Sequence, residues 1–291
     1  MSASALPEID SLWDYDQPAV SEARFRSLLP EAGDEALDYQ LQLKTQLARS
    51  LGLQRKFSAA LTLLDEVSNH LPPEPCLARV RYLLERGRVY NSTGERERAR
   101  PLFEQALKLA SKMKADYYAV DAAHMLGIAA EPDQQLSWNL EALKMAEQSS
   151  DERTQKWLGS LYNNIGWTYH DRGEYAKALE LFEKCLAWHS ERKTGEGELI
   201  ADWSVARTLR SLGRTEEALT RQQALLQLRQ ARQLPEDGYV SEEIGECLLA
   251  LGKGAEAAPY FAKAWELLSA DPWLKANEAK RLQRLKELGR H

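Results

Sequence analysis

The feature that most constrains this 291-residue sequence is a set of small residues that recurs every 39 or 40 positions. One column of small residues is Ala60, Ala99, Ala178, Ala218 and Ala257, with Asn139 in the place of the missing member. A second column lies twelve residues earlier and contains only alanine and glycine: Ala48, Gly87, Gly127, Gly166, Ala206 and Gly245. Between the two columns come Gly94, Gly173, Gly213 and Gly252, each five residues before its alanine. A glycine at that place favours a helix end in the left-handed conformation, so each unit is predicted to be two helices joined by a tight turn.

The spacing therefore predicts an all-α protein, an α-solenoid of antiparallel helix hairpins. Small residues let the two backbones of a hairpin approach closely, and a Phe or Leu four residues after the alanine column fills the space between neighbouring hairpins. We expect six full repeats at about residues 41–74, 80–113, 120–153, 159–192, 199–232 and 238–271. A degenerate N-terminal repeat or cap is expected over residues 1–40, and a C-terminal capping helix over residues 272–291.

Some units depart from the pattern. The third unit lacks the turn glycine, has Pro132 near its helix junction and has Asn139 in the alanine column. The fifth unit has Gln222 in the Phe column. At the C-terminus, residues 272–288 fit a single helix with leucines on one side and charges elsewhere, which suits the polar cap that a solenoid needs.

The best unit carries a motif of named residues: Tyr162, Ile165, Gly166, Tyr169, Gly173, Tyr175, Ala178, Leu179, Phe182, Cys185 and Leu186. This pattern resembles the tetratricopeptide repeat family, and the resemblance covers nearly the whole chain. It implies a right-handed superhelix whose concave groove binds a partner. The period is longer than the family's usual period of about 34 residues. It is closer to the longer arrays of kinesin light chains and of some bacterial peptide-sensing regulators.

Composition and motifs exclude several classes of function. A net charge of −6 argues against general nucleic-acid binding, and no run of about 18 apolar residues could span a bilayer. The start of the sequence lacks a signal-peptide pattern, so we expect a cytoplasmic protein. The three cysteines are far apart and form no CxxC pair, and the histidines lack metal-ligand spacing. With no nucleotide-binding or hydrolase motif present, neither an enzyme activity, a metal nor a cofactor is expected.

The candidate binding residues form a stripe on the first helix of each unit, one position away from the core column. In the resemblance to tetratricopeptide repeats, this stripe lines the groove. The residues that could bind a partner there are Arg49, Arg88, Asn91, His124, Asn163, Trp167, His170, Trp203, Arg207 and Arg210. Tryptophans flanked by arginines are enriched at binding hot spots, although each of these residues could instead be a solvated or packing side chain.

These residues favour a non-catalytic scaffold that binds a protein or peptide, and the arginines suit an acidic or carboxylate-bearing partner. The carboxylate clamp of chaperone-binding family members is not expected, because no unit pairs Lys and Asn at the required positions. Two alternatives stay open: a sensor of a small molecule or signalling peptide, and a self-associating assembly factor. The second alternative would use Leu12, Trp13 and Phe25 as its contact.

Overall fold

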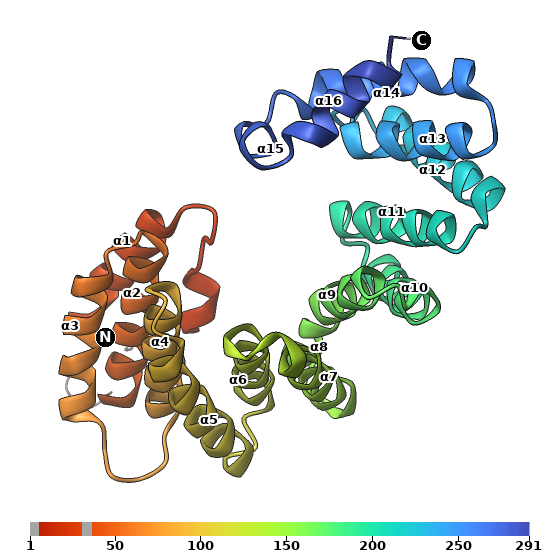
Figure 1. The fold of residues 1–291 in the computed structure, drawn as a ribbon. Coiled ribbons are helices and arrows are strands. Elements are labelled where there is room, and N and C mark those ends of the chain that lie inside the picture. Colours follow the sequence, from red (N-terminus) through yellow and green to blue (C-terminus); the bar gives the residue numbers. More distant parts are fainter. Residues whose placement is uncertain (1–5, 31–36, 291) are drawn as a thin grey trace. The chain divides into compact units, whose positions relative to one another are not determined.

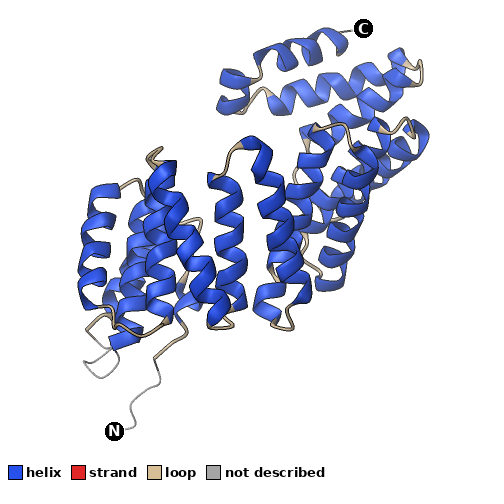
Figure 2. Cartoon of the chain, turned by 60° about the horizontal axis from the view of Figure 1, so that its bottom comes forward, coloured by secondary structure: helices blue, strands red, loops and turns tan. Residues whose placement is uncertain are grey.

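The computed structural model describes residues 6–30 and 37–290, and every regular element within these ranges is a helix (Figure 2). The chain forms two compact units, Met1–Trp157 and Leu158–His291. Parts of the expected N-terminal cap, residues 1–5 and 31–36, lie outside the described residues. No helix in the described part is long and apolar enough to cross a bilayer.

The first unit is built from helix hairpins that follow a short N-terminal segment (Figure 1). The hairpins are α2 with α3, α4 with α5, and α6 with α7, and the first helix of each also contacts the helix before it. The elements are η1 (Ile9–Leu12), α1 (Pro18–Leu28), α2 (Leu37–Leu53), α3 (Phe57–His70), α4 (Leu77–Ser92), α5 (Arg96–Lys112), α6 (Asp116–Ala129), α7 (Pro132–Gln148) and α8 (Glu152–Gln155).

The second unit repeats the same arrangement. Its hairpins are α9 with α10, α11 with α12, and α13 with α14, followed by two short helices. The elements are α9 (Trp157–Asp171), which starts at the last residue of the first unit, α10 (Tyr175–Arg192), α11 (Glu196–Ser211), α12 (Thr215–Ala231), α13 (Gly238–Ala250), α14 (Gly254–Leu268), α15 (Pro272–Asn277) and α16 (Ala279–Leu288).

The C-terminal cap differs from the sequence-based prediction in one respect. Residues 272–288 form two helices rather than one, because the backbone leaves the helical conformation at Glu278, where φ is −122°. Leu274, Leu282 and Leu285 are nevertheless buried against the last hairpin. The leucine stripe was therefore predicted correctly, but the single helix was not.

The small columns have the close packing that their spacing predicts. A Cβ atom added at Gly87 would lie 2.4 Å from the ring of Phe103, and one at Gly166 would lie 2.7 Å from the ring of Phe182. The turn glycines adopt the left-handed conformation that the sequence predicts, with φ of 84° at Gly94 and 76° at Gly173. The α4–α5 and α9–α10 hairpins are thus each closed at a turn glycine and tightly packed where an aromatic ring meets a glycine.

In the third and fifth hairpins, a polar side chain takes the place of the aromatic ring. Pro132 is the first residue of α7, where its missing N–H costs nothing. The Asn139 amide lies where a ring lies in other hairpins, 2.9 Å from an added Cβ at Gly127. In the fifth hairpin, Gln222 is fully buried and its Nε2 donates to the carbonyl oxygen of Trp203 at 3.5 Å.

Candidate binding grooves

All the candidate residues lie on the first helix of a hairpin, but they form two sets, one in each unit. Arg49 is on α2, Arg88 and Asn91 are on α4, and His124 is on α6. The other set comprises Asn163, Trp167 and His170 on α9 with Trp203, Arg207 and Arg210 on α11. We describe the two sets separately, as the first groove and the second groove.

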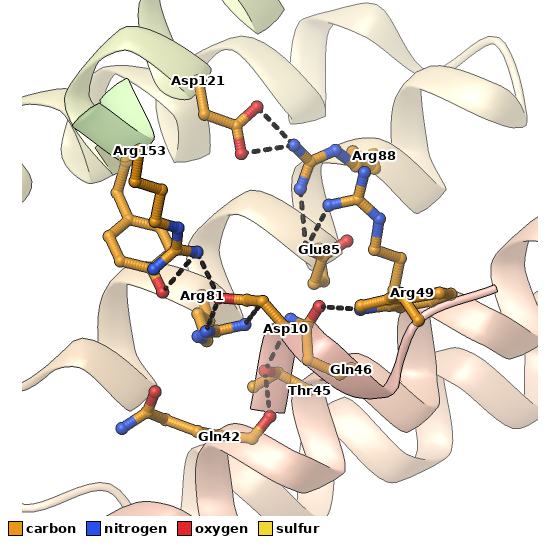
Figure 3. A network of polar contacts seen from close by, with 12 residues as sticks. Asp10, Gln42, Thr45, Gln46, Arg49, Arg81, Glu85, Arg88, Asp121 and Arg153 are labelled. Atoms are coloured by element: carbon orange, nitrogen blue, oxygen red, sulfur yellow. Dashed lines mark hydrogen bonds and ion pairs between the residues drawn. The ribbon is translucent and has the colours of Figure 1, made fainter. Parts of the chain in front are cut away.

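The arginines of the first groove already hold carboxylates of the chain (Figure 3). Arg88 donates to Glu85 at 2.7 Å and to Oδ2 of Asp121 at 2.6 Å. Arg49 donates to the same Glu85 at 3.4 Å. Burial opposes the charge of Arg88, but Asp121 and Glu85 outweigh it and raise the pKa of this guanidinium above its ordinary value. These arginines are parts of ion pairs that join consecutive hairpins.

A pocket of about 260 Å³ lies beside this network, between α2 and α4. Its polar lining includes Arg49, Glu85, Arg88 and Asn91. Three atoms there, Nε of Arg49, Oε2 of Glu85 and Oδ1 of Asn91, are buried without a hydrogen-bond partner in the described part of the chain. Asn91 therefore shares a pocket with two of the predicted arginines.

His124 contacts two residues of the first unit. Its Nδ1 lies 3.2 Å from Oδ1 of Asn139, and its ring centroid lies 5.4 Å from that of Trp157. Burial lowers the pKa of His124, with the result that the neutral imidazole is favoured.

The first groove also contains residues that the stripe did not include. Asp10, from η1, contacts Arg81 of α4 and Arg153 of α8, and Trp13 contacts Gln46 of α2. The repeat register contained no signal for Asp10 or Trp13, because the segment before α1 has no counterpart in the other units. Phe25, expected as part of a self-association contact, is fully buried within the first unit and is not available to a second copy.

In the second groove, aromatic rings from three consecutive first helices lie next to one another. The ring centroids of Trp167 and Trp203 are 5.8 Å apart, and those of Trp203 and Tyr239 are 6.1 Å apart. Trp167 also packs on Phe182 and His170, each at 5.0 Å. The sequence-predicted tryptophans are therefore brought together, and Tyr239 of α13 extends their row.

The arginines of the second groove share one buried carboxylate. Nε of Arg207 lies 2.9 Å from Oε1 of Glu243, and Arg210 donates to both oxygens of the same carboxylate at 2.8 and 3.0 Å. Nε2 of His170 lies 3.0 Å from the hydroxyl of Ser211. Burial lowers the pKa of His170, and the charge of Arg207 lowers it further. Arg207, Arg210 and His170 therefore already bond to other residues of the chain. Oδ1 of Asn163, in contrast, has no hydrogen-bond partner among the described residues.

A mainly apolar pocket of about 330 Å³ opens beside Trp203, and we call it the Trp203 pocket. Its apolar lining is Leu199, Ile200, Trp203, Leu225, Tyr239 and Val240. Ile200 is 50% exposed and Tyr239 is 37% exposed, and both line the pocket. Nε1 of Trp203 is buried and has no acceptor within the described ranges. Arg229, paired with Glu196 and Asp237, forms the polar rim of the pocket.

Comparison with known proteins identifies the repeat. Residues 80–113 and residues 158–189 each match a tetratricopeptide repeat model. The chain is a tetratricopeptide-repeat protein. The two matched segments cover the α4–α5 hairpin of the first unit and the α9–α10 hairpin of the second. A search of curated proteins found no significant match to this tetratricopeptide-repeat protein.

Solved structures support the fold. The apo form of RapI aligns with a TM-score of 0.72 at 14% identity, covering 91% of this tetratricopeptide-repeat protein and 74% of RapI. A signal transduction ATPase with a tetratricopeptide repeat sensor, from Pyrococcus horikoshii, aligns with a TM-score of 0.72 at 16% identity. That alignment covers 93% of this chain but only 43% of the ATPase. BtubC from P. vanneervenii gives a TM-score of 0.58 at 15% identity, covering 80% and 95% of the two chains. At these identities the likeness shows the fold alone.

Among the described residues, no group of three or more His, Cys, Asp or Glu side chains is placed to hold a metal ion. Two of the cysteines, Cys185 and Cys247, are buried in the helical core. Burial raises the pKa of the Cys185 thiol to about 11 and that of Cys247 to about 12. Such thiols are poor nucleophiles and serve here as small packing residues.

Proposed function

We propose that this protein is a non-catalytic scaffold that binds a segment of a partner protein or a peptide in the second groove. Tetratricopeptide repeats suggest an interaction scaffold, and one observation carries the more specific proposal. The Trp203 pocket leaves a mainly apolar cavity of about 330 Å³ open beside a row of aromatic rings. An exposed apolar recess of this kind is typical of the place where a partner's anchor side chain is buried.

The main anchor is proposed to be an apolar side chain of the partner. A carboxylate was the expected anchor, but Arg207 and Arg210 already donate to Glu243. A partner carboxylate would have to compete with this buried internal acid, whereas an apolar side chain would fill open space. Burying a leucine-sized side chain there contributes about 1.5–3 kcal/mol to binding.

Polar groups around the pocket would fix the orientation of a bound segment. Asp237 and Glu196, next to Arg229, favour basic over acidic residues at the rim.

A displayed library of random peptides tests the proposal. Peptides selected on the wild-type protein should bind Ile200→Asp at least about tenfold more weakly, because a charge would enter the Trp203 pocket. Leu228→Asp is the matched control, since Leu228 lies on α12, is 37% exposed and does not line the pocket. Equal binding by wild type and Ile200→Asp would place the site elsewhere.

The size of the Trp203 pocket supports a second candidate, a small-molecule sensor. Ligand sites commonly measure about 300–1,000 Å³, and this pocket lies at the low end of that range. A thermal-shift screen with metabolites separates the two functions. A small molecule that raises the melting temperature of wild type but not of Ile200→Asp would favour the sensor.

A further inference from the structure

The N-terminal segment Pro7–Tyr15, which we call the strap, lies against the first helices of the first unit. Its apolar anchor is Ile9, which is 5% exposed and packs with Phe25, Leu43 and Leu47. The only regular structure in the strap is the four-residue helix η1. The strap thus lies along the first groove as a short peptide would, and Figure 3 shows its Asp10 in contact with Arg81 and Arg153.

The carboxylate of Asp10 is held by two arginines from different helices. Arg81 donates to both of its oxygens, at 3.0 and 2.8 Å, and Arg153 contacts one of them. Arg81 is only 4% exposed, and its guanidinium lies 5.1 Å from the ring centroid of Tyr118. Burial raises the pKa of Asp10, but these arginines outweigh it and hold the pKa below its ordinary value.

This arrangement is a built carboxylate site. A buried arginine that forms two parallel hydrogen bonds is strongly selective for a planar anion. Without the strap, Arg81 would lose the acid that compensates its charge, which is costly. The first groove therefore requires a carboxylate at this place, whether from the strap or from another chain.

Trp13, three residues after Asp10, makes the second specific contact between the strap and the first groove. Its Nε1 donates to Oε1 of Gln46 at 3.0 Å, and its ring packs edge-on against Phe25 with centroids 5.0 Å apart. The guanidinium of Arg49 lies 5.7 Å from the Trp13 ring and 5.4 Å from that of Tyr15. The groove thus recognises an indole through its N–H, its edge and its face.

The strap can leave without unfolding a hairpin. The Asp10 side chain is 24% exposed and Tyr15 is 55% exposed. The strap contributes no helix to the hairpins. Tyr39 donates one hydrogen bond to the carbonyl oxygen of Pro7, and the other bonds to the strap backbone come from Ser21 and Arg24 of α1, which is not part of a hairpin. Both specific contacts are of a kind that another chain could supply.

We propose that the first groove is a second peptide-binding site, which takes a segment with an aspartate and a tryptophan three residues apart, and that a partner carrying this pattern displaces the strap. The site is distinct from the Trp203 pocket and does not depend on it. A tethered strap competes at an effective concentration of about 1 mM or more. The intact protein therefore binds such segments weakly until the strap is released.

The test uses a fluorescein-labelled peptide with the sequence of residues 6–16 and the full-length protein. The double variant Asp10→Asn with Trp13→Ala weakens the strap in the protein but leaves the groove unchanged. Fluorescence anisotropy should show this variant binding the peptide at least about tenfold more tightly than wild type. Adding Arg153→Gln to the variant, or replacing the aspartate of the peptide that corresponds to Asp10 by asparagine, should reverse the gain. Asp16→Asn with Trp273→Ala is the matched control and should bind as wild type does.

Three results would overturn the proposal. The first is equal peptide binding by wild type and the double variant. The second is a loss of the helical circular-dichroism signal in the double variant and also in Trp13→Ala alone, which would make the strap part of the fold. The third is a wild-type dimer, seen by light scattering and absent in the double variant, which would assign the groove to the strap of a second copy.

Discussion

Nη2 of Arg88, on α4, lies 2.6 Å from Oδ2 of Asp121, on the next first helix, α6. The repeat register places Arg88 in the groove, but its charge forms an ion pair that joins two hairpins. Arg49 with Glu85, and Arg207 with Glu243, repeat this relationship in both units. Ion pairs between successive repeats therefore account for four arginines that were expected to attract an acidic partner.

The pairing of Arg88 with Asp121 should be measurable as a coupling energy. Both side chains are mostly buried, at 17% and 5% exposure, so a double-mutant cycle to alanine should give a coupling of about 2 kcal/mol or more. The exposed pair Arg100 and Glu104 on α5 is the control and should give about 0.5 kcal/mol or less. Urea unfolding of the variants supplies the energies. Similar coupling in the two pairs would show that the buried pair does not hold the hairpins together.

Gly87→Ala should destabilise the protein by about 1–3 kcal/mol, because the new methyl group would overlap the fully buried ring of Phe103. Gly52→Ala is the matched change, since its nearest neighbour is a Val89 methyl at 3.8 Å. There the better helix propensity of alanine should raise stability by up to about 1 kcal/mol. Thermal and urea unfolding of the two variants should therefore shift in opposite directions. A stabilised Gly87→Ala variant would contradict the packing described for the α4–α5 hairpin.

Ala178→Glu should lower the free energy of unfolding by about 3 kcal/mol or more. Ala178 is fully buried on α10, and a carboxylate there would be both too large and unpaired. Ala176→Glu, on an exposed position of the same helix, should change stability by less than about 0.5 kcal/mol. Because repeats contact mainly their neighbours, hydrogen exchange should show the loss of protection concentrated in the second unit. A uniform loss of hydrogen-exchange protection across both units would contradict this prediction.

The protein should lose stability as the pH falls below about 6.5, the ordinary histidine value. Burial lowers the pKa values of His124, His170 and His189 in the folded state. The unfolded chain then binds more protons than the folded one between the lowered values and about 6.5, and stability rises with pH through that window. Urea unfolding between about pH 5.5 and 7.5 should show this slope, and His170→Gln should flatten it. A free energy of unfolding that increases on acidification would contradict these protonation states.

Much of the fold follows from the sequence because the repeat imposes the same steric requirement six times. In three of the units a phenylalanine ring of the second helix fills the space beside the small residue, at Gly87, Gly166 and Gly245. The register also placed Trp167 and Trp203 together correctly. The break between α15 and α16 was missed, because the leucine stripe continues through Glu278 although the backbone does not.

The pairing of the arginines could have been found from sequence separation. Arg49 precedes Glu85 by 36 residues, and both Arg88 and Arg210 precede their acids by 33 residues. These separations are slightly shorter than one repeat, which places each arginine opposite an earlier turn of the next first helix. The strap could not have been found in this way, because the contacts of Asp10 with Arg81 and Arg153 span 71 and 143 residues and occur once.

Site-specific photo-crosslinking tests the central claim, that a partner segment enters the Trp203 pocket. A benzophenone-bearing amino acid would replace Ile200 in one protein and Leu228 in another, and each would be irradiated with a peptide selected on the wild type. We predict a crosslinked peptide from the Ile200 position, mapped by mass spectrometry, and none from Leu228. Crosslinking at Leu228 alone, or equal yields at the two positions, would contradict binding in the second groove.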